Sequence, residues 1–157
     1  MSWDSTTYDY ARSWANQCRF EHSGPAGFDN NGNGENLATS SNAQSFPAEQ
    51  STERWYSEIT SAYGGNGYQA GTASNNAIYG QSGGADQVGH YTALIWRSTT
   101  KLGCAICPQS GAQWEVDVCQ YSDTTPNMLP ASNYVDNVPQ SNTPTATESS
   151  CCVSRCT

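Results

Sequence analysis

The sequence predicts one disulfide-stabilised domain of the α/β class, followed by a short tail. Three observations lead to this prediction. The first part of the chain repeats apolar side chains at the spacing of a buried helix face, and a later segment alternates them as a strand does. Seven cysteines are typical of a small extracellular domain. A chain of 157 residues is long enough for one domain with a real core but short for two.

The composition argues against two classes of function. Fourteen Asp and Glu against six Lys and Arg give a net charge of −8. Such a chain would repel a nucleic-acid backbone, so we expect no nucleic-acid partner. No apolar run approaches the roughly 20 residues that a membrane-spanning helix needs, so we expect no transmembrane segment. The abundance of Asn, Ser, Thr and Gly, together with the cysteines, indicates a secreted, extracellular protein.

The first predicted helix covers residues 2–18, with Ser2 available as its N-cap. Side chains at spacings of three and four form its buried face. They are Trp3, Thr7, Tyr10, Ala11, Trp14 and Cys18.

The segment 23–34 is rich in Gly, Asn and Pro, so we expect a loop. Asp29 and the asparagines after it imitate the start of an EF-hand calcium loop. The twelfth position of that pattern is Ser40, where a calcium loop needs a bidentate Glu. The pattern therefore predicts a turn rather than a calcium site.

A second helix is predicted from Pro47 to Tyr63. Proline suits the first turn of a helix, and two glycines follow Tyr63 and end it. Trp55 marks the inner face of this helix, and Glu58 projects from or beside that same face. A carboxylate in that position requires a partner.

A long surface excursion is predicted over residues 64–84, which are mostly Gly, Ser, Asn and Ala with a few aromatic side chains. Asp86 could then cap a short helix. That helix would carry His90 and Leu94 on one side, because residues four apart lie on the same face.

A β-hairpin is predicted near the middle of the remaining chain. Residues 113–121 alternate as a half-exposed strand does. One face carries Trp114, Val116 and Val118, and the other carries Glu115, Asp117 and Cys119. If the hairpin is centred near Gly111 and Ala112, Cys104 lies opposite Cys119. Opposed residues are about 4.5 to 5.5 Å apart at Cα, within reach of a disulfide.

Residues 139–157 form a flexible tail by composition, rich in Pro, Ser and Thr, so we expect the domain to cover residues 2–138. An odd number of cysteines leaves at least one thiol free, capped or intermolecular. Within the tail we expect Cys156 to pair with Cys151 or Cys152.

Five blocks of sequence carry a resemblance to a known family. They are Trp3-Asp4 with Trp14-Ala15, Cys18-Arg19-Phe20-Glu21-His22-Ser23, Gly34-Glu35-Asn36-Leu37-Ala38, Trp55 with Glu58, and Gly89-His90-Tyr91-Thr92-Ala93-Leu94-Ile95-Trp96. In this order and spacing they resemble the CAP superfamily, the cysteine-rich secretory, antigen 5 and pathogenesis-related proteins. Five ordered blocks are hard to obtain by chance.

The resemblance implies a three-layer α-β-α sandwich whose central sheet is mostly antiparallel. It also implies a disulfide between Cys18 and Cys107, which would join the first helix to the hairpin. In the family a further helix normally precedes the pair Trp3-Asp4. We therefore expect the domain to be short of that first helix, through truncation or divergence.

Four residues match those that line the central cleft of the family: His22, Glu35, Glu58 and His90. The family is known for a divalent ion, often zinc, between the two imidazoles, with carboxylates that orient the rings or hold a metal-bound water. Two histidines alone give a weak, exchangeable site. The alternative is a buried polar network that ties distant segments together.

The resemblance favours a secreted, non-enzymatic binding module in defence or host interaction. In some relatives loops bind sterols, fatty acids or protein targets, and Tyr63, Tyr68 and Tyr79 would line such a ligand loop. One alternative is a zinc-dependent hydrolase in which Glu35 or Glu58 is the general base. The other is a structural extracellular protein. It would be cross-linked through its tail cysteines, whereas otherwise we expect a monomer.

Overall fold

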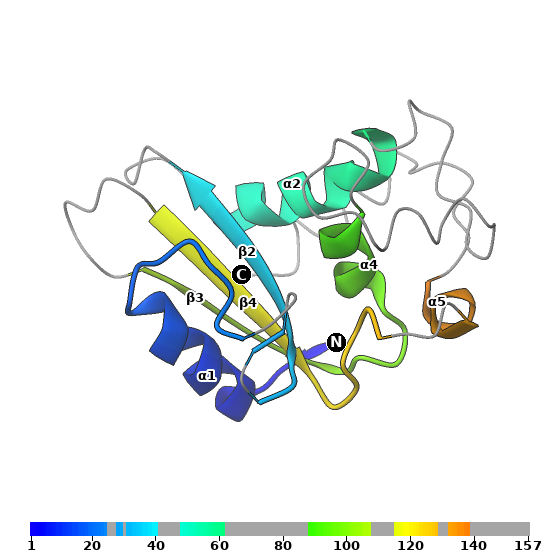
Figure 1. Cartoon of the computed structure of the whole chain (residues 1–157), viewed down its shortest axis with the longest axis horizontal. Coiled ribbons are helices and arrows are strands. Elements are labelled where there is room, and N and C mark those ends of the chain that lie inside the picture. The colour runs from blue at the N-terminus through cyan, green and yellow to red at the C-terminus, as the bar shows by residue number, and fades with distance from the viewer. Residues whose placement is uncertain are drawn as a thin grey trace.

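A four-stranded sheet with helices on both of its faces forms the centre of the protein in a computed structural model (Figure 1). The structure describes residues 1–24, 28–29, 31–40, 48–61, 88–107, 115–128 and 132–138. The strands are β1 (Ser2–Trp3), β2 (Gly34–Ser40), β3 (Lys101–Ile106) and β4 (Glu115–Ser122), in the spatial order β1-β3-β4-β2. β1 runs parallel to β3, and β4 runs antiparallel to both β3 and β2. The predicted three-layer sandwich with a mostly antiparallel sheet is confirmed.

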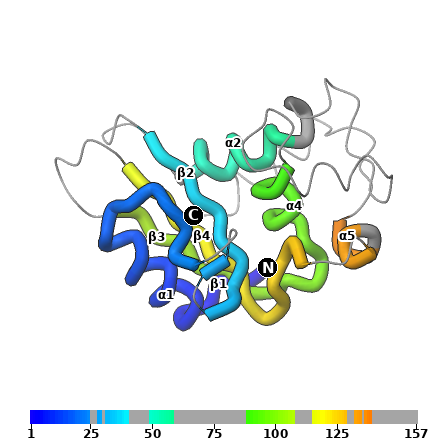
Figure 2. Tube along the Cα trace, in the orientation of Figure 1, coloured from blue at the N-terminus to red at the C-terminus, as the bar shows by residue number. Residues whose placement is uncertain are grey.

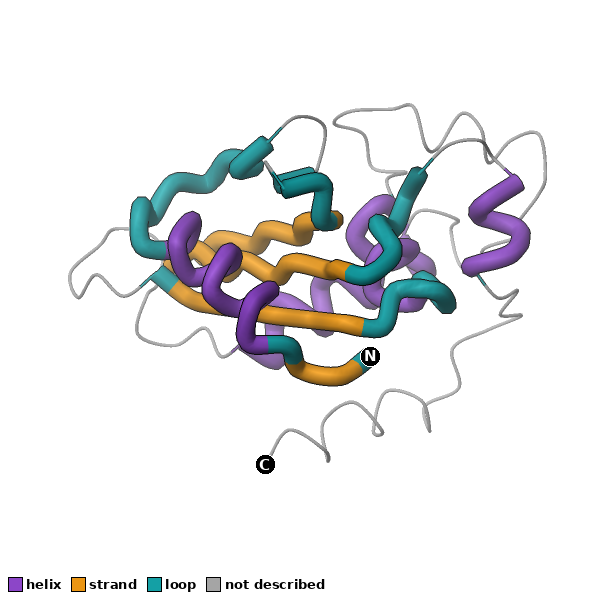
Figure 3. Tube along the Cα trace, turned by 90° about the horizontal axis from the view of Figure 1, so that it is seen from below, coloured by secondary structure: helices purple, strands orange, loops and turns teal. Residues whose placement is uncertain are grey.

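Helix α1 (Ser5–Ala15) covers one face of the sheet (Figure 3). Its small buried side chains, Ala11 and Ala15, pack against apolar residues of three strands. These residues are Leu37, Ala105, Val116 and Val118. The helix lies so close to β3 that a Cβ atom on Gly103 would stand 2.1 Å from the backbone nitrogen of Tyr8. Glycine at this position therefore permits the contact between helix and sheet.

The first helix is shorter than the predicted range of 2–18. Its first two predicted residues instead form β1 with the start of β3. The cap is therefore not Ser2 but Asp4, whose carboxylate accepts a hydrogen bond from the Thr7 N–H at 2.8 Å. Beyond the helix, Cys18 adopts a positive φ of 51°, and the chain turns back toward the sheet.

Helices α2 (Ala48–Ser61) and α4 (Gly89–Ile95) cover the opposite face of the sheet, and α5 (Ser132–Asn137) packs beside α4. The side chains buried between α2, α4 and the sheet are Ala38, Trp55, Ala93, Cys119 and Tyr121. Trp55 also donates its indole N–H to the carbonyl of Leu37 at 3.0 Å. Because β2 is an edge strand, this contact gives its backbone a partner that a neighbouring strand does not supply.

Helix α2 corresponds to the helix predicted from Pro47 to Tyr63, and α4 corresponds to the short helix predicted around His90. The expected cap of α4, Asp86, lies outside the described residues. The residue in the N-cap position is Val88, which makes no side-chain hydrogen bond to the helix.

The hairpin of β3 and β4 has the predicted register. Cys104 lies opposite Cys119, and a disulfide joins them. A second disulfide links Cys18, after α1, to Cys107, after β3, which is the pairing implied by the family resemblance. The prediction that the second strand is half exposed was wrong. All but the last residue of β4 are buried, because helices cover both of its faces and strands flank both of its edges.

Several predictions concern residues outside the described part of the chain. They include the ligand loop with Tyr63, Tyr68 and Tyr79, the tail 139–157, and the pairing of Cys156 with Cys151 or Cys152. These remain expectations, as does the domain range 2–138. Among the helices that the structure does describe, none is both long and apolar enough to cross a bilayer.

Candidate functional site

The first half of the candidate site surrounds the buried carboxylate of Glu35. After α1 the chain turns back across the sheet toward β2 (Figure 2). His22 and Ser23, in this returning segment, contact the carboxylate. His22 Nδ1 lies 2.9 Å from Glu35 Oε1, and the Ser23 N–H donates to the same oxygen at 2.9 Å. Oε2 accepts from the Ser23 hydroxyl at 2.7 Å and from Gln120 Nε2 at 2.8 Å. The carboxylate is therefore contacted from two segments of the chain, residues 22–23 and strand β4.

These contacts keep Glu35 ionised. Burial alone would raise its pKa, but hydrogen bonds from His22, Gln120 and Ser23 outweigh burial and lower the pKa below its ordinary value. An ionised carboxylate only accepts hydrogen bonds, so His22 must donate through Nδ1. When the ring is neutral, its Nε2 atom then carries a free lone pair.

The second half of the site joins Glu58 of α2 to His90 at the start of α4. His90 Nδ1 lies 2.6 Å from Glu58 Oε1, and the Tyr91 N–H donates to Oε2 at 3.0 Å. The first backbone N–H groups of a helix have no partner within it, so Glu58 satisfies one of them. The His90 ring also stacks on Trp55, with ring centroids 6.1 Å apart. The partner that Glu58 was expected to need is therefore His90.

Strand β2 joins the two halves. Successive residues of a strand point to opposite faces, so Glu35 and Asn36 reach different sides of the sheet. Asn36 Nδ2 donates to the His90 carbonyl at 3.1 Å and to the Tyr121 hydroxyl at 3.0 Å. Strand β2 thus supplies Glu35, the carboxylate that contacts His22, and Asn36, the amide that binds the backbone of His90.

The two His–Glu pairs have the chemistry of ligands for a divalent ion. A histidine that binds a metal usually donates its other ring N–H to a carboxylate, which fixes the tautomer and the ring orientation. Both pairs have this arrangement, and neither Nε2 atom has a hydrogen-bond partner among the residues that the structure describes. The side chains of His22 and His90 are 36% and 32% exposed, so solvent reaches them. Within the described ranges, no three His, Cys, Asp or Glu side chains form a ready-made metal site.

Two residues of the site were not among the predicted ones. Gln120 and Ser23 both donate to Glu35. The alternation in β4 contains a signal for Gln120, because it continues the face that carries Val116 and Val118. A polar side chain in such a buried row needs a partner. Ser23 has no comparable signal, since its position depends on the turn that precedes it.

The turn predicted at Asp29 is present. Its Oδ1 accepts the backbone N–H groups of Asn31 and Asn33 at 2.8 and 2.7 Å. Its Oδ2 accepts the side-chain amides of the same two residues. An Asp that holds its own loop in this way has the role of a turn residue.

Known proteins match this chain over most of its length. The family model described as the cysteine-rich secretory protein family, CAP, matches residues 1–121. Human cysteine-rich secretory protein 2 is 35% identical over 131 residues, which are 82% of this chain and 48% of that protein. Venom allergen 3 of Solenopsis invicta is 31% identical over 107 residues, which are 66% of this chain and 42% of that protein. The chain spans about half the length of the curated relatives it matches.

Solved structures match the fold as well. The crystal structure of NaASP2 with Zn2+ has a TM-score of 0.61 and 29% identity, covering 82% of this chain and 62% of that one. The structure of BmVAL-1 has a TM-score of 0.63 and 27% identity, covering 82% of this chain and 61% of that one.

Proposed function

The chain belongs to the CAP family of cysteine-rich secretory proteins, and on this basis we propose that it is a secreted, non-enzymatic binding module with a divalent-metal site. His22 and His90 contact residues on the two faces of the edge strand β2, so a shared ion would have to bind Nε2 of both rings across that edge. Zinc is a metal that imidazole binds well. When bound, the ion would polarise an oxygen of a water molecule or a ligand. With two protein ligands, the ion would be weakly held and exchangeable.

The matched orientation of the two histidines is the observation that carries this proposal. Each ring meets a carboxylate through Nδ1, at 2.9 Å for His22 and 2.6 Å for His90. A metal site needs one unprotonated ring nitrogen on each histidine, and a carboxylate that holds Nδ1–H leaves Nε2 for that purpose. The similarity to a protein crystallised with Zn2+ is consistent with this proposal.

The same contacts favour binding over hydrolysis. A general base must accept a proton from a reacting water, but Glu35 and Glu58 already accept hydrogen bonds from the two imidazoles and from backbone N–H groups. The Ser23 hydroxyl donates to Glu35, so it is not arranged as a nucleophile activated by His22.

A zinc titration by calorimetry tests the metal site. Free thiols are first alkylated, because cysteines outside the described residues would compete for zinc. We expect one equivalent of zinc to bind, and His22→Ala or His90→Ala to weaken binding at least about tenfold. Glu58→Gln should weaken it about 10- to 100-fold, since it loosens the orientation of a ligand.

Asp9→Asn is the matched control. It removes a carboxylate that is exposed and pairs only with Arg12 among the described residues, and it should leave zinc affinity unchanged. Zinc affinity that is the same in the wild type and in both histidine variants would refute the metal site. Turnover of ester or peptide substrates that is lost in His90→Ala would instead support the hydrolase.

We also propose a sterol, fatty acid or protein as the ligand of the loop predicted over 64–84. This part rests on the family alone. An assay of lipid retained by the full chain distinguishes this loop proposal from the metal site. Lipid retention should survive the double change His22→Ala and His90→Ala. It should fall when Tyr68 and Tyr79 are both changed to Ser. Equal retention by the loop variant would count against it.

A further inference from the structure

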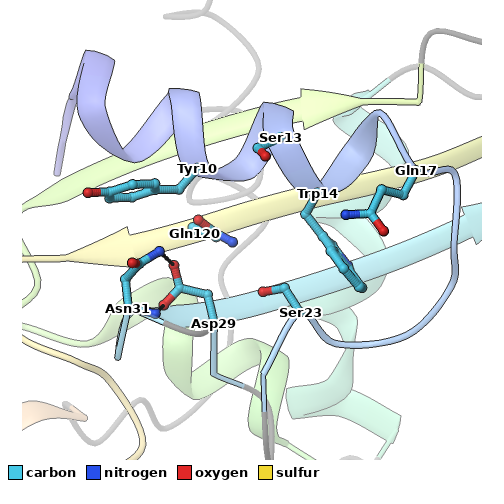
Figure 4. Close-up of a pocket in the computed structure, with 8 residues that line it drawn as sticks. All are labelled: Tyr10, Ser13, Trp14, Gln17, Ser23, Asp29, Asn31 and Gln120. Carbon is cyan, nitrogen blue, oxygen red and sulfur yellow. Dashed lines mark hydrogen bonds between the residues drawn. The ribbon is translucent and has the colours of Figure 1, made fainter.

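An open pocket of about 200 Å³ lies beside the Glu35 network, on the α1 face of the sheet (Figure 4). One wall is formed by Tyr10 and Trp14 of α1 and by Gln17, which lies just beyond the end of the helix. The other wall is formed by Ser23 and by the turn at Asp29. Liquid water occupies about 30 Å³ per molecule, so the pocket has room for roughly six or seven waters, or for one small ring.

The Trp14 ring of this wall is held by contacts within the protein. The Trp14 indole N–H donates to the Glu21 carbonyl at 2.7 Å. The Arg19 guanidinium also lies 6.0 Å from the Trp14 ring centroid. Tyr10, one helical turn earlier, is 41% exposed, so its ring is available at the mouth of the pocket. Tyr10 and Trp14 thus present two aromatic rings from one helix face.

The base of the pocket contains an acceptor without a donor. Gln120 is only 1% exposed, and its Nε2 atom is committed to Glu35. Its Oε1 atom is buried and has no hydrogen-bond partner among the described residues. In Figure 4 this amide lies between Tyr10 and the side chain of Asn31. A buried acceptor of this kind is expected to pair with an O–H or N–H group that enters from the pocket.

The charge of the pocket selects a neutral ligand. Among its described lining residues there is no Lys, Arg or His to bind an anion. The one carboxylate, Asp29, already accepts hydrogen bonds from the backbone and side chains of Asn31 and Asn33, so it does not require a cation. What remains is an amide acceptor, hydroxyl and amide groups, and two aromatic rings.

We propose that this pocket binds one pyranose ring of a neutral carbohydrate. The apolar C–H face of the sugar would lie on Tyr10 and Trp14. A sugar hydroxyl would donate to Gln120 Oε1 after a small shift of the amide, while others would meet the polar groups of the opposite wall. A few convergent polar groups beside aromatic rings are the usual composition of a small-ligand site. The proposal is independent of the metal site, although Ser23 and Gln120 contribute to both.

Two-dimensional NMR of the full, metal-free chain tests this proposal, with EDTA present. The probes are the methyl pyranosides of glucose, galactose, mannose and N-acetylglucosamine. We expect at least one to cause saturable shifts of the Trp14 indole and Gln120 amide signals, with affinity in the millimolar range that is typical of contacts to a single small ring.

Tyr10→Ala should weaken that binding at least tenfold, and because Tyr10 is exposed this variant should still fold. Trp3→Ala is the control, since it removes a 60% exposed aromatic side chain that does not line the pocket, and it should bind as the wild type does. His90→Ala should also bind as the wild type does, which separates this result from the metal site.

Three outcomes would overturn the proposal. The first is that no neutral pyranoside causes saturable shifts. The second is that Tyr10→Ala binds as well as the wild type. The third is that only a charged probe binds at these signals, for which methyl glucuronide and glucosamine are the comparisons.

Discussion

Two buried acids belong to neighbouring strands of the sheet, Glu35 to β2 and Asp117 to β4. Their surroundings shift their pKa values in opposite directions. Glu35 and Asp117 are each 4% exposed. Glu35 accepts hydrogen bonds from His22, Ser23 and Gln120, which lower its pKa despite burial. Burial raises the pKa of Asp117, because the hydroxyl of Ser51 is its one donor within the described residues and its Oδ1 atom has no partner there.

The contrast shows that hydrogen-bond donors decide the direction of the pKa shift for these two equally buried acids. Glu115, a second acid on β4, lies near Asp117 and further disfavours negative charge there. Burial raises the pKa of Glu115, and the nearby charge of Asp117 raises it further. The surroundings of Glu35 therefore favour its ionised form, whereas burial opposes the ionised forms of Glu115 and Asp117 on β4.

Removing Glu35 should have the largest effect. Glu35→Ala leaves the donors of Ser23 and Gln120 unpaired, and we expect a loss of about 3 kcal/mol in the free energy of unfolding. Urea unfolding measures this loss. Glu21→Ala is the control, since Glu21 is exposed and pairs with Arg19 at the surface, and it should change stability by less than about 0.5 kcal/mol. Equal stability of the two variants would show that the donors around Glu35 do not matter.

Removing the Ser51 hydroxyl that donates to Asp117 should have the next largest effect. Ser51→Ala takes away a hydrogen bond to a buried acid, and we expect a loss of about 1.5 kcal/mol at neutral pH. The same change made in an Asp117→Asn background should cost less, because the uncharged amide depends less on this donor. Identical losses in both backgrounds, measured by urea unfolding, would contradict the role given to Ser51.

Removing the charge of Asp117 should produce a smaller effect of opposite sign. Asp117→Asn no longer requires a buried charge, so we expect the free energy of unfolding at neutral pH to rise by about 1 kcal/mol. The exposed Asp9→Asn change is the control and should have little effect. A clear loss of stability in Asp117→Asn would show that the carboxylate is better accommodated than its contacts indicate.

The smallest expected effect is the pH dependence of the stability difference between Asp117→Asn and the wild type. The folded pKa of Asp117 is raised, so its contribution to stability is present below the ordinary pKa of an Asp and is lost as the pH rises through the folded value. The folded pKa of Glu35 is lowered, so its contribution is present above the ordinary pKa of a Glu and is lost as the pH falls through the folded value.

The advantage of Asp117→Asn over the wild type should therefore shrink as the pH falls from about 7 to about 4. Urea unfolding at a series of pH values measures this trend. An advantage that grows toward acid pH would have the wrong sign for a raised pKa.

Local spacing was enough to predict the hairpin and its disulfide. Strand alternation fixes which residues share a face, so the opposition of Cys104 and Cys119 follows once the turn is placed. The prediction of Ser2 as the cap of α1 was wrong, because Ser2 pairs with β3 instead. The two segments are about a hundred residues apart in sequence, and no local pattern reveals their contact. The burial of β4 was also misjudged, since alternation alone does not show that helices cover both faces.

The family resemblance identified the four residues of the candidate site, but it did not identify which glutamate pairs with which histidine. Which glutamate orients which histidine depends on β2, where adjacent residues reach opposite faces of the sheet. The role of Gln120 was missed for a related reason. Its partner, Glu35, lies on a different strand, and only the register of β2 against β4 brings the two residues face to face.

The tautomers of the two imidazoles provide the most direct test of the proposed metal site. The chain has only two histidines, so long-range proton–nitrogen NMR assigns them without ambiguity. At a pH where the rings are neutral, His22 and His90 should both carry the proton on Nδ1. One equivalent of zinc should then shift both Nε2 signals together. A proton on Nε2 of either ring, or a zinc response confined to one ring, would contradict a shared metal site.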